Sequence, residues 1–303
     1  TGAGSTVFVK NVIGDCLLCD AMRDAEIALY DIDGARLAES EELILALNRS
    51  INENRATIKA YLGLENRRSA LEGADFVINA VQVGLYDPCT IIDFEIPKKY
   101  GLRQTIGDTL GIGGIFRALR TIPVLRGLAE DMEAVCPKAW FLNYTNPMAM
   151  LTGFMQRYTD IKTIGLCHSV QTCADTVLRE CGIEAAGHKE LIAGINHMDS
   201  DGRDLYPDIR RIAAEKNASA EGHKDMVRFD YILKFGYYCT ESSEHNAEYN
   251  PFYIKSRYPE LIEKYHIPLD EYPRRCVNQI EKWKTQKAEI MNGGNIEHTR
   301  SIE

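Results

Sequence analysis

Short apolar segments alternate with longer amphipathic segments through the first half of this 303-residue chain. Four short segments have the length and composition of buried strands: 26–33, 74–81, 139–144 and 162–166. Residues 36–52 and 116–128 instead repeat apolar side chains at helical spacing. Strands separated by helices are typical of βαβ units. The sequence therefore predicts an α/β fold, with a doubly wound, Rossmann-like parallel sheet in a first domain, 1–165, and a second domain, 166–303.

Charge and composition argue against several classes of protein. The net charge of −9 leaves no basic surplus to neutralise phosphates, so we expect no nucleic-acid partner. No apolar run approaches the ~18 residues of a membrane helix and there is no signal peptide, so we expect no membrane partner. The nine cysteines are scattered and odd in number, which indicates free thiols and a cytoplasmic location.

The opening sequence Gly2-Ala3-Gly4-Ser5-Thr6 has the pattern of a dinucleotide-binding loop. Glycines let the backbone approach a pyrophosphate at a helix N-terminus. Asp31, at the end of the next strand, can bond the ribose hydroxyls and favours NAD over its phosphorylated form. The third glycine of the pattern is absent, so an ordinary glycine turn is the alternative. The residues expected to bind NAD are Gly2, Gly4, Ser5, Thr6, Asp31 and Asn79.

Two later segments each carry a potential metal ligand. Cys167 follows the strand 162–166, and His197 follows the apolar residues 191–193. A thiolate and an imidazole suit a divalent transition metal, and two protein ligands leave coordination positions open for a substrate. The alternative for Cys167 is a simple apolar packing role. Asn146 beyond one strand end, and Asp108 in the glycine-rich loop 107–114, are further candidates for a pocket at the sheet edge.

These segments together resemble glycoside hydrolase family 4, and within it the α-galactosidase branch. The resemblance covers Gly2 to about Trp283. The segments that carry it are Gly2-Ala3-Gly4-Ser5-Thr6-Val7-Phe8, Asp108-Thr109-Leu110-Gly111-Ile112-Gly113-Gly114, Leu119-Arg120-Thr121-Ile122-Pro123, Asn143-Tyr144-Thr145-Asn146-Pro147-Met148, Gly165-Leu166-Cys167-His168-Ser169-Val170, Gly194-Ile195-Asn196-His197-Met198 and Thr240-Glu241-Ser242-Ser243-Glu244-His245. The resemblance implies a second domain of α+β type, as in lactate and malate dehydrogenases, and a homodimer or homotetramer.

The resemblance also implies an unusual route for hydrolysis of an α-galactoside, which this family follows in place of the two-carboxylate route. NAD oxidises C3 of the sugar, a base removes the C2 proton, and the leaving group departs from C1 by elimination. Water then adds at C1 and the hydride returns to C3. A divalent metal, with Mn²⁺ as the expected ion, stabilises the oxygen charge that develops.

The resemblance assigns residues to these steps one at a time. Cys167 and His197 match the metal ligands, and Asn146 matches an asparagine that binds the substrate. His168 occupies the position of the proton donor. For the C2 base we favour Glu241, with His245 and Tyr249 as alternatives. Asp108 is expected to support the base or a metal-bound water.

One departure from the family pattern concerns the substrate. Members that act on phosphorylated sugars carry an arginine where this chain has Thr90. Threonine cannot bind a phosphate with two parallel donors, so an unphosphorylated glycoside is expected. An α-glucoside or α-galacturonide remains an alternative, because Arg117, Arg120 or Arg228 could supply a cation for a uronate. An NAD-dependent 2-hydroxy-acid dehydrogenase is the alternative from another class, and it leaves Cys167 without a role.

The sequence is also expected to lack some segments of its family. The dinucleotide pattern should follow an apolar strand, whereas the sequence begins at Thr1, within the turn. A polar tail follows Met291, and 199–202 stands where a strand could continue. Members of the family are longer than this chain.

Overall fold

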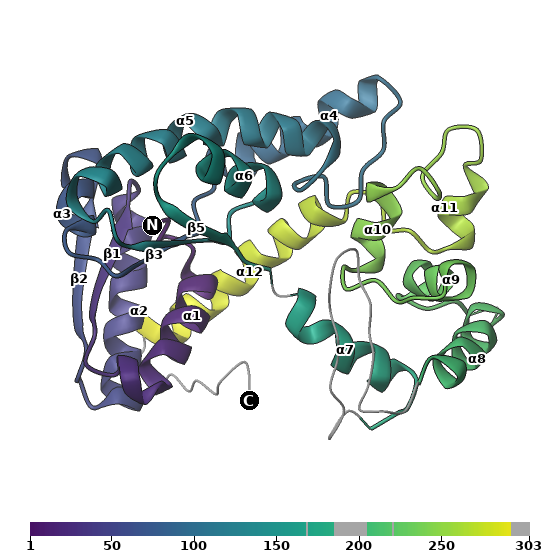
Figure 1. Ribbon diagram of the computed structural model, residues 1–303, viewed down its shortest axis with the longest axis horizontal. Helices are drawn as coiled ribbons and strands as arrows, with labels where there is room; N and C mark the ends of the chain where they lie inside the picture. The colour runs from purple at the N-terminus through teal and green to yellow at the C-terminus, as the bar shows by residue number, and fades with distance from the viewer. Residues whose placement is uncertain (168, 185–204, 220, 292–303) are drawn as a thin grey trace. The chain divides into compact units, whose positions relative to one another are not determined.

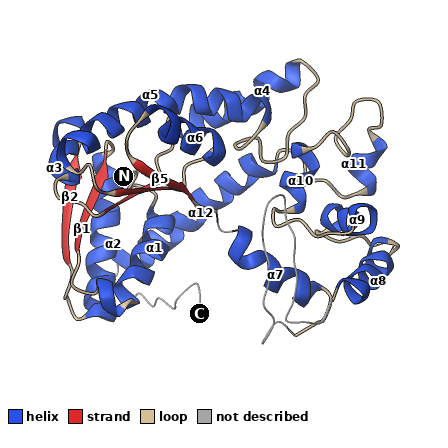
Figure 2. Cartoon of the chain, viewed as in Figure 1, coloured by secondary structure: helices blue, strands red, loops and turns tan. Residues whose placement is uncertain are grey.

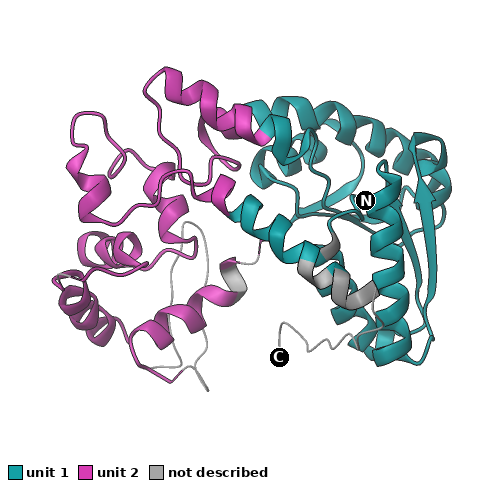
Figure 3. Ribbon diagram, turned by 180° about the vertical axis from the view of Figure 1, so that it is seen from behind, with its two compact units in different colours: residues 1–89, 116–166, 275–303 teal, residues 90–115, 167–274 magenta. Residues whose placement is uncertain are grey.

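The computed structural model describes residues 1–167, 169–184, 205–219 and 221–291. The chain divides into two compact units, coloured separately in Figure 3. Unit 1 contains 1–89, 116–166 and 275–303, and unit 2 contains 90–115 and 167–274. The border after Leu166 lies one residue from the expected border at 165, but neither unit is continuous in sequence. Two long helices explain this, because α5 (Gly111–Val135) and α12 (Glu271–Met291) each contribute residues to both units.

The strands of unit 1 are all parallel. They are β1 (Glu26–Asp31), β2 (Thr57–Leu62), β3 (Phe76–Asn79), β4 (Trp140–Asn143) and β5 (Lys162–Gly165), drawn red in Figure 2. β1 pairs with β2 with Glu26 opposite Thr57, and β4 lies between β3 and β5 with Trp140 opposite both Phe76 and Lys162. The predicted parallel α/β architecture is confirmed. β2 was not predicted from the sequence, although it alternates Ile58, Ala60 and Leu62 with Lys59 and Tyr61.

The strands form a two-stranded sheet, β1-β2, and a three-stranded sheet, β3-β4-β5, and helices lie on both sides of them. The helices of unit 1 are α1 (Thr6–Leu18), α2 (Gly34–Asn52), α3 (Arg67–Leu71), α6 (Met148–Tyr158) and the unit 1 parts of α5 and α12. Figure 1 shows α1 and α2 on one face, with α5 and α6 on the other. Leu125 and Met132 of α5 are fully buried with Phe141 of β4 in one apolar core, and Ile44 and Leu47 of α2 are fully buried in another. Burial of each such side chain contributes about 1.5–3 kcal/mol, so two apolar cores hold the doubly wound arrangement.

Residues 1–3 connect the two groups of strands. The amide of Ala80 donates to the carbonyl of Thr1, and the amide of Ala3 donates to the carbonyl of Tyr30, both at 3.0 Å. The amino group of Thr1 donates to the carbonyl of Ile78 at 2.6 Å. This segment therefore lies between β1 and β3, and the glycine loop emerges at the carboxyl ends of the strands.

Within the residues that the structure describes, unit 2 consists of helices joined by loops and contains no strand. Its helices are α4 (Ile91–Lys99), α7 (Ser169–Glu180), α8 (Tyr206–Asn217), α9 (Met226–Phe235), α10 (Ser243–Tyr249) and α11 (Glu260–Lys264). Short helical turns at Asp20–Met22, Leu64–Asn66 and Leu85–Thr90 complete the chain. Phe229, Ile232 and Tyr238 are buried where α7, α8 and α9 pack together. The apolar segment 191–193 and the segment 199–202, where a strand could have continued, lie outside the described residues. None of the helices in the described ranges is long and apolar enough to cross a membrane.

Candidate functional site

Gly2 and Gly4 lie where neighbouring atoms leave no room for a side chain. Gly2 has a φ of +76°, and a Cβ there would lie 2.6 Å from the carbonyl carbon of Ala80. A Cβ on Gly4 would lie 2.9 Å from Oδ2 of Asp31. The amide of Gly4 donates to that same oxygen at 2.7 Å. The loop is thus fixed against Asp31, and a side chain at either glycine would collide with these protein atoms.

The first turn of α1 offers donors for an anion. Ser5 occupies the N-cap position, and its side chain makes no hydrogen bond that caps the helix. The first backbone N–H groups of a helix have no intrahelical partner, and together with the helix dipole they favour a phosphate. The side chain of Thr6 lies outside the described part of the structure.

The carboxylate of Asp31 is held by two backbone hydrogen bonds. Its Oδ1 accepts from the amide of Asp33 at 3.0 Å, while Oδ2 accepts from Gly4. Arg36, on α2, donates from Nε to the carbonyl of Gly4 at 3.0 Å. A carboxylate has about four acceptor positions, so capacity remains for ribose hydroxyls. The glycine loop, the helix N-terminus and Asp31 therefore fit a dinucleotide.

Asn79 makes hydrogen bonds within the protein. It is fully buried, and its amide donates to Asn143 Oδ1 at 2.9 Å and to Thr145 Oγ1 at 3.0 Å. Its Oδ1 accepts from the hydroxyl of Thr1 at 2.9 Å. The side chain thereby ties the carboxyl ends of β3 and β4 together. This arrangement orients the backbone at the sheet edge where the dinucleotide is expected.

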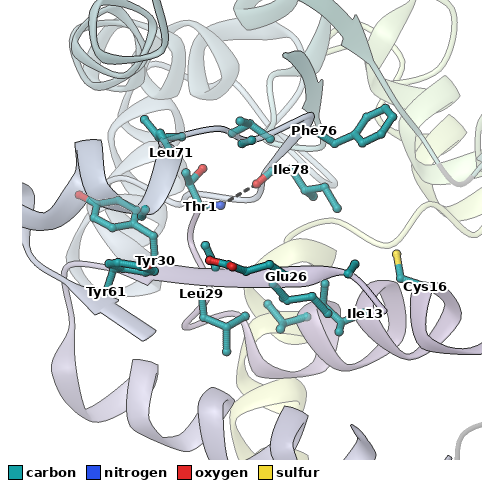
Figure 4. A pocket seen from close by; sticks show the side chains of 18 of the residues that line it. Thr1, Ile13, Cys16, Glu26, Leu29, Tyr30, Tyr61, Leu71, Phe76 and Ile78 are labelled. Atoms are coloured by element: carbon teal, nitrogen blue, oxygen red, sulfur yellow. Dashed lines mark hydrogen bonds between the residues drawn. The ribbon is translucent and has the colours of Figure 1, made fainter. Parts of the chain in front are cut away.

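A cavity of about 460 Å³ lies along β1 and β3 (Figure 4). Its lining includes Ile13, Leu29, Leu71 and Ile78, with Glu26 among the few charged members. Most of these side chains are apolar, and they come from the length of β1 and β3 and from α1. The lining also includes Thr1, Ala3 and Ala80, which lie beside the glycine loop.

Asn146 follows β4, in unit 1. It precedes a cis peptide bond to Pro147, and its Oδ1 accepts from the amide of Met148 at 3.3 Å. These contacts fix the turn into α6. The position after a strand end is the one predicted for a residue that binds substrate.

Cys167 is the one predicted metal ligand that the structure describes. Its side chain is exposed, two residues after the end of β5, and its Sγ accepts from the amide of Ser169 at 3.5 Å. His197 and the candidate proton donor His168 lie outside the described residues. Within the described ranges, no group of three or more His, Cys, Asp or Glu side chains could hold a metal ion. An exposed thiol at a strand end does fit one ligand of a catalytic metal.

Ser169 connects Glu241 to the thiol of Cys167 by hydrogen bonds. The hydroxyl of Ser169 donates to Oε1 of Glu241 at 2.7 Å, and the amide of Ser242 donates to the same oxygen at 3.1 Å. His245 Nδ1 lies 3.3 Å from that oxygen and 2.9 Å from the hydroxyl of Ser242. The structure thus brings Cys167 and the candidate base Glu241 into one cluster. The sequence prediction gave Ser169 no role, although it stands in the motif that contains Cys167.

Asp108 and Tyr249 belong to the same part of unit 2. Asp108 is buried, and its Oδ1 accepts from the hydroxyl of Thr109 at 2.8 Å. The hydroxyl of Tyr249 is buried and makes no hydrogen bond within the described residues. Burial raises the pKa of Tyr249 well above its usual value, and the carboxylates of Glu241, Asp108 and Glu248 raise it further. Burial therefore favours the neutral form of Tyr249.

All three arginines considered for a uronate have partners within the protein. Arg228 is buried, its Nε donates to the buried carboxylate of Asp225, and its guanidinium lies over the ring of Tyr238. Asp225 compensates this charge, so Arg228 is no free cation. Arg120 donates from Nε to the carbonyl of Val83 at 3.1 Å. Thr90 is buried.

Comparisons with known proteins agree with the resemblance. The model of family 4 glycosyl hydrolases matches residues 1–183, and the model of the C-terminal domain of that family matches residues 192–303. The α-galactosidase of Bacillus subtilis is 60% identical over 308 residues, which cover 100% of this chain and 70% of that protein.

Solved structures show the same fold. The Bacillus subtilis protein LplD, which carries the name of a glucosidase, matches with a TM-score of 0.82 and 26% identity over 99% of this chain and 72% of its own. A 6-phospho-α-glucosidase from gut microorganisms, solved with NAD and Mn²⁺, matches with a TM-score of 0.67 and 18% identity over 94% of this chain and 68% of its own.

Proposed function

The chain belongs to family 4 of the glycosyl hydrolases, and on that premise we propose that it hydrolyses α-galactosides with NAD and a divalent metal ion as cofactors. The identity of 60% to an α-galactosidase supports this substrate. Thr90, in place of a phosphate-binding arginine, agrees with an unphosphorylated sugar.

The chain's own residues would hold both cofactors. The backbone at Gly2 and Gly4, the hydroxyl of Ser5 and the carboxylate of Asp31 would bind NAD, and Cys167 with His197 would bind the metal. Bound NAD supplies a reversible hydride acceptor for C3 of the sugar, and the metal supplies a Lewis acid. The glycine loop supports the first assignment, because a Cβ at either glycine would collide with neighbouring atoms.

Glu241 acts as the base that removes the proton from C2. The observation that carries this role is the hydrogen bond from Ser169 to Glu241, which joins the carboxylate to the segment of the metal ligand Cys167. A general base must lie within hydrogen-bond reach of its substrate and must accept a proton at the working pH. Burial raises the pKa of Tyr249, so Glu241 is the preferred candidate of the two. His168 is placed by the resemblance as the acid that protonates the leaving group.

The experiment is a cleavage assay with nitrophenyl α-galactoside, supplied with NAD, Mn²⁺ and a thiol reductant together. We expect release of nitrophenol only when all three are present, and little release from the β-galactoside or from an α-galacturonide. We also expect no accumulation of NADH, because the hydride returns to C3 in each turnover. NADH that accumulates in proportion to product would support the dehydrogenase alternative, and cleavage without NAD would overturn the cofactor assignment.

A further inference from the structure

Glu248 makes a set of contacts that the proposed reaction does not itself require. Its carboxylate accepts hydrogen bonds from three consecutive backbone amides in the segment before Asp108. The distances are 2.8 Å from Thr105 and 3.2 Å from Ile106 to Oε2, and 2.9 Å from Gly107 to Oε1. The two partners are separated by more than 140 residues in sequence, so this is a long-range contact within unit 2.

These hydrogen bonds fix the shape of the segment. Bonds from backbone N–H to a carboxylate are among the stronger ones in proteins, and a buried N–H that loses its partner is costly. A second contact joins the same elements, because the hydroxyl of Thr105 donates to the carbonyl of Glu244 at 2.7 Å. Gly107 has a φ of +58°, and a Cβ there would lie 2.9 Å from the ring of Phe94. These contacts therefore hold the 105–107 turn in the conformation that the structure shows.

The segment leads directly to Asp108, and Glu248 stands on α10, whose N-cap Ser242 follows Glu241. Burial raises the pKa of Tyr249, the residue next to Glu248, and the nearby carboxylates of Glu241 and Asp108 raise it further. One short helix thus connects the candidate base to the turn that carries the second candidate acid.

We propose that Glu248 is a positioning residue, which holds the 105–107 turn on α10 and so fixes the carboxylate of Asp108 relative to Glu241. This inference rests on the proposed function, because it assumes that Asp108 and Glu241 take part in the proposed reaction. Glu248 itself does not touch the sugar. A misplacement of about 1 Å in a catalytic group can lower a rate by about a hundredfold, so loss of this contact should be visible in turnover.

A double-mutant cycle tests the inference. The variants are Glu248→Gln, Asp108→Asn and the pair combined, and Glu260→Gln on exposed α11 is the control with the same charge change. We expect Glu248→Gln to lower kcat by about tenfold to a hundredfold with a smaller change in KM. Because Glu248 acts through Asp108, the double variant should be no slower than Asp108→Asn alone. Glu260→Gln should keep the activity of the unmodified chain.

A second measurement does not depend on activity. Hydrogen exchange of the amides of Thr105, Ile106 and Gly107 should become faster in Glu248→Gln and stay unchanged in Glu260→Gln. If Glu248→Gln does not fold, Glu248→Asp, which keeps the charge on a shorter side chain, takes its place in both measurements.

The outcomes separate this inference from the proposed function. Losses in kcat that multiply in the double variant would overturn the role through Asp108, and unchanged exchange at 105–107 would overturn the contact itself. If the unmodified chain cleaves no α-galactoside, the proposed function fails, whereas the exchange measurement still decides whether Glu248 holds the turn.

Discussion

The hydroxyl of Ser169 donates to Oε1 of Glu241 at 2.7 Å, across 72 residues of sequence. The backbone amide of the same serine donates to Sγ of Cys167 at 3.5 Å. Ser169 therefore links the thiol that is proposed to bind the metal to the carboxylate that is proposed to act as base. In an elimination from a sugar ketone the metal and the base must act on adjacent carbons, and this link supplies that proximity.

Glu241→Gln keeps the size of the side chain and removes its basicity. We expect kcat to fall by about a hundredfold or more, as for loss of a general base. Ser169→Ala should lower kcat by only about tenfold, because a hydrogen bond to a charged group contributes about 1.5 kcal/mol or more. Steady-state kinetics on nitrophenyl α-galactoside measure both changes. Full activity of Glu241→Gln would exclude Glu241 as the base and return His245 to consideration.

Asp31→Asn tests the preference for NAD. The amide oxygen can still accept from Gly4, but the negative charge that opposes a 2′-phosphate is gone, and Arg36 stands beside the loop. We expect weaker binding of NAD and improved binding of NADP, measured by titration of each cofactor. The control is Asp33→Asn, which makes the same charge change at the cap of α2. An equal shift in both variants would argue for a general charge effect.

Cys167→Ser tests the metal ligand. A serine hydroxyl is a poor substitute for a thiolate, so binding of Mn²⁺ measured by calorimetry should be lost while the thermal unfolding midpoint is kept. Oxidants should also inactivate the unmodified chain, because an oxidised thiol cannot bind the metal. Cys181→Ser is the control, because burial raises the pKa of Cys181 to about 11 and keeps it a thiol. Unchanged Mn²⁺ binding by Cys167→Ser would end this assignment.

His223 makes the stability of unit 2 depend on pH. Its Nδ1 accepts from the amide of Asp225 at 3.2 Å, and its Nε2 lies 2.8 Å from Oδ1 of Asn217, which fits the neutral ring. Burial lowers the pKa of His223 below its usual value of 6.5. The folded state thus binds fewer protons than the unfolded state, so this contribution is full above pH 6.5 and is lost as the pH falls below it.

The variant that tests this pH dependence is His223→Asn. The unfolding midpoint of the unmodified chain should drop between about pH 8 and about pH 5.5, and the drop should be smaller in the variant. An equal drop in both would show that other groups cause the dependence.

Four of the five strands that the structure describes were predictable from sequence because each is a short, mostly apolar segment between longer helical ones. The segments expected at 26–33, 74–81, 139–144 and 162–166 correspond to β1, β3, β4 and β5. β2 was missed because Lys59 and Glu65 give its neighbourhood a polar composition. Gly4 and Asp31 were found together because a dinucleotide loop imposes both residues within one βαβ unit.

Contacts between distant segments were not predictable in the same way. The bonds from Ser169 to Glu241 and from Thr105 to Glu248 depend on how helices of unit 2 pack, and no local pattern encodes that. The same holds for Arg228, which looked like a free cation in sequence but pairs with the buried Asp225. The compositional signals identify residue types, whereas the partners of those residues follow from the tertiary structure.

We propose that Glu241 removes the C2 proton of an α-galactoside during hydrolysis. The most direct test is to run the cleavage of nitrophenyl α-galactoside in heavy water, with NAD, Mn²⁺ and reductant, and to analyse the galactose by NMR. We predict solvent deuterium at C2, because the C2–H bond is broken and formed again in each turnover. A two-carboxylate glycosidase never breaks that bond. Galactose without deuterium at C2 would contradict the account, even if the chain proved to be an α-galactosidase.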